Sequence, residues 1–445
     1  YNIIHIMWLK PKFAANSFFL LFFCCVFAGC SLDRRVATKV KKAFQESAFL
    51  HQYPVGFELF DLDKGKVIYG QNNHQYFVPA SNTKLYTFYA ALMTLPDTIP
   101  ALRYIEKGDS LIFWGTGDPS FLHRELQGKR ALEFLRKHRG KLFYAPGRYT
   151  GEIYGAGWAW DDYNEDFQAE ITELPLYGNL VEVQVEGGMK ISPGAFQPAF
   201  LRDSLSDRPQ GSIKRDFLNN RFHVPSGTLT FKTQLLPFKT STALTLALLT
   251  DTLHREVGGI ALKMPDSART LFDLPRDSVL KQMLLPSDNF IAEQLLLLCA
   301  DQVSASLGTA ETIAATEKKF LASLPDKPVW VDGSGLSRYN LFTPADMVRV
   351  LELIYKRVND RKKLFAMLPA GGKSGTLKRA YPTTDQPFVF AKTGTLSGVH
   401  NQSGYVVTRR GKTYIFSFMN NNFVQPVAQV RKEMVKMMMY IHENF

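Results

Sequence analysis

The sequence predicts an α/β (α+β) fold in which a domain with a central antiparallel sheet flanked by helices is interrupted by a strand-rich insertion. Strand-like segments occur near both ends of the chain beside segments with helical periodicity, so the two ends can pair in one sheet. Between about residues 96 and 236, short apolar runs alternate with Gly, Pro and Asp turns. With 445 residues, 45% of them hydrophobic, the chain is long enough for two or three domains.

The early elements are predicted from turn and cap signals. Residues 56–70, GFELFDLDKGKVIYG, form two apolar-rich runs around Asp63-Lys64-Gly65 and predict a hairpin. Residues 81–95, SNTKLYTFYAALMTL, predict a helix with Ser81 as its N-cap. Within the insertion, Trp158 and Trp160 are read as core residues, with stacking on a sugar or stem peptide as the alternative.

The later elements return to helical periodicity. Residues 241–260 predict a helix that a Gly-Gly pair stops, and residues 401–422 predict a hairpin turning at Arg410-Gly411. The last segment, 426–445, predicts a helix with a stripe of Val, Met and Ile. These elements place a discontinuous domain at 31–95 and 237–445 and an inserted β-rich domain at 96–236.

The first 30 residues are typical of an export signal. Lys10 and Lys12 precede eleven apolar residues, 18–28, which are too few to span a bilayer. The run ends in FAGCS, which resembles the lipobox of bacterial lipoproteins and implies lipidation of Cys30, although Phe27 replaces the usual leucine. An ordinary cleaved signal is the alternative. Either way, the sequence predicts an exported, periplasmic protein, with a membrane anchor if Cys30 is lipidated.

Charge and metal-ligand patterns exclude several classes of function. The net charge is +12, which suits nucleic acid or an anionic envelope polymer, and export favours the polymer over nucleic acid. Four cysteines, two of them in the signal, allow no disulfide framework. No His-Glu-x-x-His pattern occurs among the nine histidines, so neither a metal nor another cofactor is predicted.

Two short motifs precede helical segments. Ser-x-x-Lys occurs as SNTK, from Ser81 to Lys84, and Ser-x-Asn occurs as SDN, from Ser287 to Asn289. Taken singly, each also fits a structural role, with the serines or Asn289 as helix caps and Lys84 as a surface amine.

A third motif, Lys-Thr-Gly at 392–394, lies in the strand-like run FVFAKTGTL. Two of the three patterns are duplicated, as SVLK from Ser278 to Lys281 and as KSG from Lys373. Residue type alone therefore does not select the functional copy.

The order of the three motifs resembles that of the penicillin-interacting serine acyl enzymes. The segments SVLKQMLLPSDNFIAEQLL, VDGSGLSRYNLFTP, GTLKRAY and AKTGTLSGV resemble the D-alanyl-D-alanine carboxypeptidase/endopeptidase family of low-molecular-mass penicillin-binding proteins. That family carries a long insertion between its first two motifs, and here 206 positions separate Ser81 from Ser287. The resemblance runs from about residue 50 to the end and implies a penicillin-binding/β-lactamase-like domain. It also implies that SVLK and KSG are not the motifs, and that VDGSGLSR is a loop near the cleft.

The resemblance implies cleavage of the bond between the terminal D-alanines of peptidoglycan stem peptides, and inhibition by β-lactams. Ser81 would be the nucleophile of an acyl-enzyme, and Lys84 its base, since no histidine lies in any motif. Ser287 would relay a proton to the leaving amine, and Asn289 would bind the substrate backbone. Lys392 would anchor Ser287 and attract the substrate carboxylate.

Three residues at and after the third motif complete the implied site. Thr393 and Thr395 would bind the carboxylate, and Gly394 would let the strand approach the ligand. The backbone N–H groups of Ser81 and Thr395 would form the oxyanion hole.

A base role for Lys84 requires a lowered pKa. A free lysine titrates near ~10.4, so bringing its pKa to about 7 means destabilising the charged form by roughly 4 to 5 kcal/mol. A helix N-terminus contributes only about 0.3–1 kcal/mol. We therefore expect desolvation and the second cation, Lys392, to supply most of the shift.

Two alternatives remain open at this point. A class A β-lactamase shares all three motifs but needs a deacylating glutamate shortly after the first, and no Glu-x-x-Leu-Asn segment occurs. A catalytically silent cell-wall-binding lipoprotein could keep the fold, although complete motifs argue against decay. The sequence does not decide between carboxypeptidase and endopeptidase activity.

Overall fold

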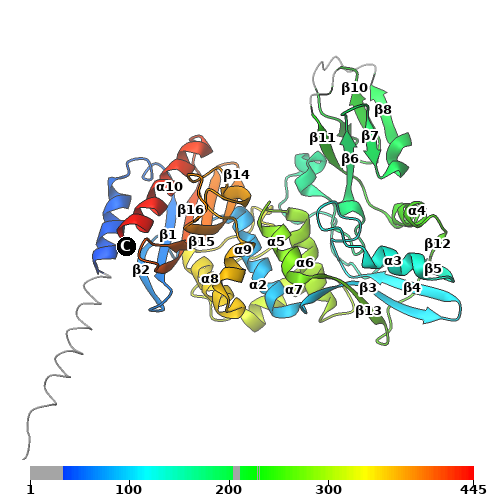
Figure 1. The fold of residues 1–445 in the computed structure, drawn as a ribbon, viewed down its shortest axis with the longest axis horizontal. Helices are drawn as coiled ribbons and strands as arrows, with labels where there is room; N and C mark the ends of the chain where they lie inside the picture. Colours follow the sequence, from blue (N-terminus) through cyan, green and yellow to red (C-terminus); the bar gives the residue numbers. More distant parts are fainter. Residues whose placement is uncertain (1–33, 204–210, 228, 230) are drawn as a thin grey trace, which may run out of the picture.

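The computed structural model describes residues 34–203, 211–227, 229 and 231–445. The predicted signal over 1–30, with Cys30, lies outside these residues. In Figure 1, a sheet built from both ends of the chain occupies one end of an elongated molecule, helices form the middle, and the strands of the insertion lie at the other end. No helix of the described part combines the length and apolar character needed to cross a membrane.

The central sheet joins the two ends of the chain, as the sequence predicts. Its order is β14-β15-β16-β1-β2, and all its neighbours are antiparallel. The strands are β1 Val55–Asp61, β2 Lys66–Gln71, β14 Val389–Leu396, β15 Val399–Val407 and β16 Thr413–Asn421. β1 and β2 form the predicted hairpin, and Gly411, at φ +79°, turns the predicted β15–β16 hairpin.

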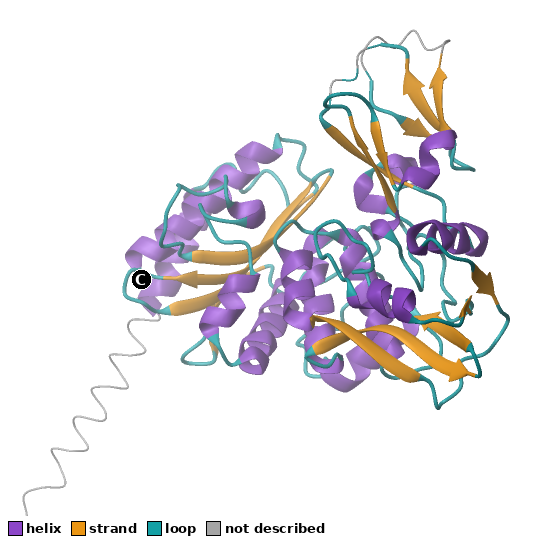
Figure 2. Ribbon diagram, turned by 45° about the vertical axis from the view of Figure 1, so that its right-hand side comes forward, coloured by secondary structure: helices purple, strands orange, loops and turns teal. Residues whose placement is uncertain are grey.

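Side chains alternate between the two faces of this sheet along each strand, and helices cover both faces. Ile415 and Met419 of β16 pack in one apolar cluster with α2 and α5 to α9, whereas Phe416 and Phe418 pack against α10 and an N-terminal helix, 34–46. Figure 2 shows these helices on the two sides of the sheet. The other helices of this half are α2 Lys84–Thr94, α5 Arg276–Leu284, α6 Asn289–Asp301, α7 Thr309–Phe320, α8 Pro344–Val358, α9 Arg361–Met367 and α10 Val427–Asn444.

The insertion has its own core and three further sheets. The largest has the order β12-β5-β4-β3-β13, and two small sheets have the orders β11-β6-β7 and β8-β10-β9. The strands are β3 Thr98–Lys107, β4 Ser110–Gly115, β5 Lys141–Tyr144, β6 Leu180–Gln184, β7 Lys190–Ser192, β8 Phe200–Asp203, β9 Lys214–Arg215, β10 Phe222–Pro225, β11 Thr233–Pro237, β12 Val257–Gly259 and β13 Arg269–Pro275. Two helices pack with them, α3 Arg130–Lys137 and α4 Thr242–Leu253.

The predicted boundary at residues 236 and 237 does not coincide with the sheets. β12 pairs with β5 and β13 pairs with β3, although both β12 and β13 follow residue 237. Leu248, Leu249 and Leu253 of α4 also belong to the core of the insertion. The insertion therefore extends through about residue 275, because both edge strands of its largest sheet, β12 and β13, follow α4 in the chain.

The helix predicted over 241–260 is shorter than expected. Ser241 caps α4 by accepting a hydrogen bond from Leu244 N (3.1 Å), and the helix ends at His254, which adopts a left-handed conformation at φ 55°. The Gly-Gly pair lies beyond this end, in β12. A histidine, rather than glycine, therefore supplies the left-handed stop.

Candidate active site

Ser81 lies in a tight turn ahead of a helix. Residues Ala80–Thr83 form the 3₁₀ turn η1, and α2 starts only at Lys84, so the prediction that Ser81 is the N-cap of this helix is wrong. Ala80 is buried at φ 48°, and Asn82 Nδ2 donates to Ser403 Oγ on β15 (2.8 Å). The turn is thus fastened to the central sheet, which fixes the place of the Ser81 hydroxyl.

Lys84 is fully buried and contacts three oxygen atoms. Its Nζ is 3.0 Å from Ser81 Oγ, 2.6 Å from Asn289 Oδ1 and 2.7 Å from the Ser334 carbonyl oxygen. Asn289 Nδ2 donates to the Phe167 carbonyl (3.1 Å), which turns its Oδ1 toward Lys84. A neutral amine has two N–H donors and one lone pair. With the donors used on the two carbonyl oxygens, the lone pair faces the Ser81 hydroxyl.

Burial is the main cause of the shifted pKa of Lys84. It lowers the pKa to about 8, and the carboxylates of Asp332, Glu293 and Asp288 oppose the fall. Burial also lowers the pKa of Lys392 well below its ordinary value, and the charge of Lys84 lowers it further. Of the two expected causes, desolvation is the larger for Lys84, and repulsion between the two amines lowers the pKa of Lys392.

In the second motif, one residue caps a helix and the other two contact the active-site lysines. Asp288, not Ser287 or Asn289, caps α6 by accepting a hydrogen bond from Ile291 N (2.9 Å). Ser287 takes a left-handed conformation at φ 70°, and its Oγ accepts a hydrogen bond from Lys392 Nζ (2.8 Å). Because Asp288 satisfies the helix end, the serine and the asparagine are left to contact the two lysines.

The third motif brings β14 against the Ser81 turn. A Cβ on Gly394 would lie 2.5 Å from Pro79 O and 2.9 Å from Ser81 N, so only glycine permits this contact. The glycine was expected to admit the ligand, whereas here it admits the backbone of η1. Lys392 is fully buried, and its Nζ also donates to the Thr393 carbonyl (2.6 Å).

β14 is an edge strand, and its outer edge faces away from β15. There Ala391 N donates to Pro369 O (3.0 Å) and Gly371 N donates to Val389 O (2.9 Å). Backbone groups of alternate residues point to the same side of a strand, so those of Thr393 and Thr395 point to this outer edge as well. The strand can therefore offer an N–H beside the Ser81 turn.

The two threonine hydroxyls also have partners. Thr393 Oγ1 donates to Thr376 Oγ1 (2.7 Å), and Thr395 Oγ1 lies 2.8 Å from Nδ1 of the buried His400. Burial lowers the pKa of His400 to about 4, so this ring is neutral at neutral pH. A neutral ring can donate from Nδ1 to Thr395 and leave the threonine proton free to point outward.

Sequence reasoning missed the residues that support Lys84. Glu293 is buried in α6 and accepts hydrogen bonds from Gly333 N (3.0 Å) and Ser334 N (2.7 Å), and burial raises its pKa to about 8. It thereby holds the loop whose Ser334 carbonyl contacts Lys84. The available signal was a lone acidic residue within the apolar helical run FIAEQLLLL.

Asp332 organises the same loop, VDGSGLSR. Its two buried oxygens accept hydrogen bonds from four donors: Gly335 N (2.8 Å), Ser337 N (2.7 Å), Asn340 Nδ2 (2.8 Å) and Trp158 Nε1 (2.9 Å). The loop was expected near the cleft as a structural element. It also supplies a direct ligand to Lys84 and links the insertion, through Trp158, to the site.

Asp332→Ala is expected to destabilise the protein by about 3–5 kcal/mol, because four donors lose their acceptor in a buried network. Asp360→Ala is the matched control, since Asp360 is exposed and caps α9 with one bond (2.9 Å), a change expected to cost about 1 kcal/mol. Urea unfolding midpoints of the two variants measure the difference. Equal losses would contradict this role of the loop.

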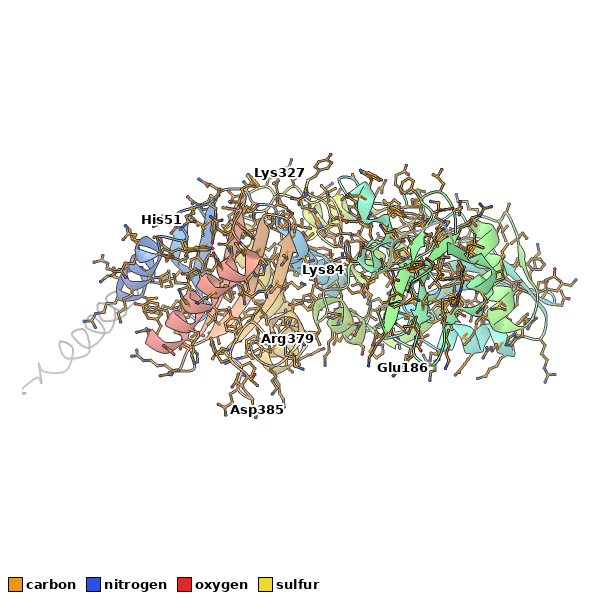
Figure 3. All side chains as sticks on the ribbon, turned by 90° about the horizontal axis from the view of Figure 1, so that it is seen from above. His51, Lys84, Glu186, Lys327, Arg379 and Asp385 are labelled. Carbon is orange, nitrogen blue, oxygen red and sulfur yellow. The ribbon has the colours of Figure 1, made fainter. Side chains whose placement is uncertain are left out.

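A cavity of about 790 Å³ opens beside the second motif. Its walls come from both halves of the molecule and include Ser287 and Asn289 on one side and His123, Asp166 and Phe167 of the insertion on the other. Figure 3 shows Lys84 in the middle of the molecule, between the two halves. The site therefore lies at a junction open to a ligand of peptide size.

The duplicated motifs lie outside the site. Ser278 and Lys281 are exposed on α5, and exposed Lys373 donates to the Asp385 carbonyl (3.1 Å). Of the two tryptophans expected in the core, Trp158 is half-buried, whereas Trp160 is 74% exposed. The core prediction is wrong for Trp160.

Comparison with known proteins gives a consistent set of relatives. A model of the D-Ala-D-Ala carboxypeptidase 3 (S13) family matches residues 36–442. The D-alanyl-D-alanine carboxypeptidase DacB of Haemophilus influenzae is 27% identical over 418 residues, covering 82% of this chain and 85% of the relative. Penicillin-sensitive carboxypeptidase A of Dictyostelium discoideum is 24% identical over 447 residues, 84% of each chain.

Solved structures confirm the predicted fold. The crystal structure of penicillin binding protein 4 from Haemophilus influenzae matches with a TM-score of 0.70 at 22% identity, covering 89% of this chain and 98% of that one. The same protein complexed with a β-lactam matches with a TM-score of 0.64 at 21% identity, with the same coverage.

Proposed function

Because the chain belongs to the D-Ala-D-Ala carboxypeptidase 3 (S13) family, we propose that it is a serine-type D-alanyl-D-alanine carboxypeptidase/endopeptidase acting on peptidoglycan stem peptides. The observation that carries the proposal is the buried Lys84 amine 3.0 Å from Ser81 Oγ, with its other two contacts on carbonyl oxygens. That arrangement gives a serine a base without a histidine.

In the first step, Ser81 Oγ attacks the carbonyl of the penultimate D-alanine while its proton passes to Lys84 Nζ. The carbonyl oxygen becomes negative and is bound by the N–H groups of Ser81 and Thr395. The contact of Gly394 with the Ser81 backbone supports this pairing, because it brings the edge of β14 beside η1.

In the second step, the peptide C–N bond breaks and the nitrogen of the terminal D-alanine takes a proton from the Ser287 hydroxyl. Lys392 holds the Ser287 oxygen (2.8 Å), and the proton that Lys84 took from Ser81 passes to Ser287, so that Ser287 is again a hydroxyl and Lys84 again a neutral base. Water then attacks the acyl ester on Ser81, with Lys84 again accepting a proton, and releases the shortened peptide.

Recognition of the substrate would use charge and strand pairing. Asn289 and the outer edge of β14 offer partners to the extended peptide backbone. Lys392 and the hydroxyls of Thr393 and Thr395 lie on the same strand and would bind the terminal carboxylate. A β-lactam would acylate the same serine, as the β-lactam complex of the Haemophilus influenzae protein suggests by analogy.

Release of free D-alanine from a pentapeptide ending in D-Ala-D-Ala tests the proposal. We expect release by the purified protein without added metal, together with slow recovery after penicillin treatment. Unchanged pentapeptide under conditions where the protein is folded would refute the proposed activity. Rapid, repeated hydrolysis of penicillin would instead favour a β-lactamase.

The rate of Ser81 acylation is expected to rise with pH and level off above about 8, because only neutral Lys84 can accept the serine proton. Below this pKa the active fraction falls about tenfold for each pH unit. Stopped-flow measurement of acylation by a chromogenic β-lactam gives the profile. A rate independent of pH between about 6 and 9 would remove Lys84 from the role of base.

We also propose that the protein is exported to the periplasm and anchored by a lipid on Cys30. The support is the sequence alone: two lysines, an apolar run of eleven residues and FAGCS. Metabolic labelling with palmitate, lost in Cys30→Ser, tests the anchor. A soluble, unlabelled periplasmic form would indicate an ordinary cleaved signal.

A further inference from the structure

We propose that the end of the molecule built from the N-terminal helix (34–46), α10 and the β15–β16 turn (409–412) is a docking surface for anionic phospholipid headgroups. We call these residues the cationic end. They lie at the extremity of the molecule opposite the strands of the insertion (Figure 1).

Positive charge is concentrated at this end. The three segments carry eleven Lys and Arg residues against three Glu, a difference of +8 in a chain whose net charge is +12. The cations are Arg34, Arg35, Lys39, Lys41, Lys42, Arg409, Arg410, Lys412, Arg431, Lys432 and Lys436. Most of the net charge of the chain therefore belongs to a small part of its length.

The N-terminal helix separates its apolar and charged residues by face. Val36, Val40 and Phe44 are buried against the central sheet and α10. All five cations of the helix are exposed, at positions 34, 35, 39, 41 and 42. Helical spacing puts these positions on the side away from the apolar stripe, so the helix presents its charge to the outside.

Two hollows open at the cationic end, and Lys39 lines both of them. One, of about 430 Å³, lies between the helix and α10 and is lined by Lys39, Lys42 and Lys436 together with Glu46 and Glu433. The other, of about 190 Å³, is lined by Arg35, Lys39, Arg410 and Lys412. The smaller hollow can admit a phosphate group between several cations.

Part of the charge is not neutralised by the protein. Lys42, Lys436 and Lys412 pair with Glu46 (3.5 Å), Glu433 (2.5 Å) and Asp61 (2.5 Å). Among the described residues, no carboxylate lies within the 4.0 Å ion-pair distance of Arg35, Lys39 or Arg410. Lys39 Nζ lies 5.9 Å from the centre of the Phe445 ring, a contact that leaves its charge uncompensated, so these three cations around the smaller hollow can bind an external anion.

The position in the chain favours a membrane over a wall polymer. Arg34 follows the apolar run 18–28 by six residues and Cys30 by four, so the cationic end contains the first described residues after that run. A basic patch beside a lipid anchor adds electrostatic attraction to anionic headgroups. The active-site residues lie away from this end, and Lys84 is in the middle of the molecule in Figure 3, so docking leaves the cleft open.

Vesicle binding tests the proposal without a lipid anchor. The chain starting at Ser31 keeps every described residue, and we expect it to cosediment with vesicles of equal parts phosphatidylglycerol and phosphatidylcholine, but not with phosphatidylcholine alone. Each cation near an anionic surface changes binding about fivefold, so the triple variant Arg35→Gln/Lys39→Gln/Arg410→Gln should bind on the order of 100-fold more weakly. Added salt should weaken wild-type binding.

The matched control is Lys107→Gln/Lys190→Gln/Lys318→Gln, which removes the same charge from exposed positions on β3, β7 and α7. Circular dichroism checks that both variants are folded, so the result does not depend on enzymatic activity. Equal binding to both vesicle types, or equal losses in the two triple variants, would overturn the proposal. So would a loss confined to binding of purified peptidoglycan sacculi, which would assign the surface to the wall.

Discussion

Ser81→Ala is expected to abolish both D-alanine release and labelling by penicillin, with kcat falling on the order of 10⁶-fold, as on removal of a serine nucleophile. The physical reason is that, in the described part of the chain, Ser81 Oγ is the one hydroxyl oxygen hydrogen-bonded to Lys84 Nζ. Ser287, the second serine of the site, contacts Lys392 instead, and its Oγ is held at 2.8 Å from that amine. Release of D-alanine is measured by a coupled oxidase assay.

Ser278→Ala is the control for this result, because Ser278 begins a Ser-x-x-Lys copy that is exposed on α5. It should keep full activity. Thermal unfolding should change little in either variant, since Ser81 is only half-buried and alanine fits the same turn. Residual activity in Ser81→Ala equal to that of the control would move the nucleophile elsewhere.

Lys84→Arg is expected to lower the acylation rate about 10²–10⁴-fold while leaving a positive charge in the site. Arginine cannot be deprotonated in proteins, so it can donate to Asn289 and Ser334 but cannot accept the Ser81 proton. The substitution thus separates the base function of Lys84 from the charge it brings. Second-order rates of β-lactam acylation measure the effect.

Lys281→Arg provides the matched control, since Lys281 is the exposed lysine of the duplicate motif. Its acylation rate should equal that of the wild type. The pH profile adds a second readout, because the rise toward about pH 8 should disappear in Lys84→Arg. A variant with near-normal acylation and an unchanged profile would show that Lys84 supplies charge only.

The sequence predicted the parts of the site that depend on residue type and order. The three motifs, the 206 positions between Ser81 and Ser287, and the flanking segments were sufficient for the family and its fold, both confirmed by comparison. The pairing of β1 with β16 followed from strand-like segments at both ends of the chain. These signals can be recognised in a single sequence because they are short motifs and segments that follow one another in a fixed order.

What escaped prediction depends on tertiary contacts. The residues SNTK alone do not distinguish a helix N-cap from a 3₁₀ turn. The turn depends on Ala80, at φ 48°, and on the contact of Gly394 with the backbone of Ser81. β12 has three residues, two of them glycine, and is a strand only because β5 lies beside it. Desolvation was expected as a cause of the lowered Lys84 pKa, but the three carboxylates that oppose it were not, because they approach Lys84 only in the folded site.

Mass spectrometry of the intact and digested protein after penicillin treatment decides whether Ser81 is the residue that is acylated. We expect one penicilloyl group per chain, on the peptide that contains Ser81, persisting for longer than an assay and absent from Ser81→Ala. An adduct on another residue, or no adduct on folded protein, would contradict the assignment.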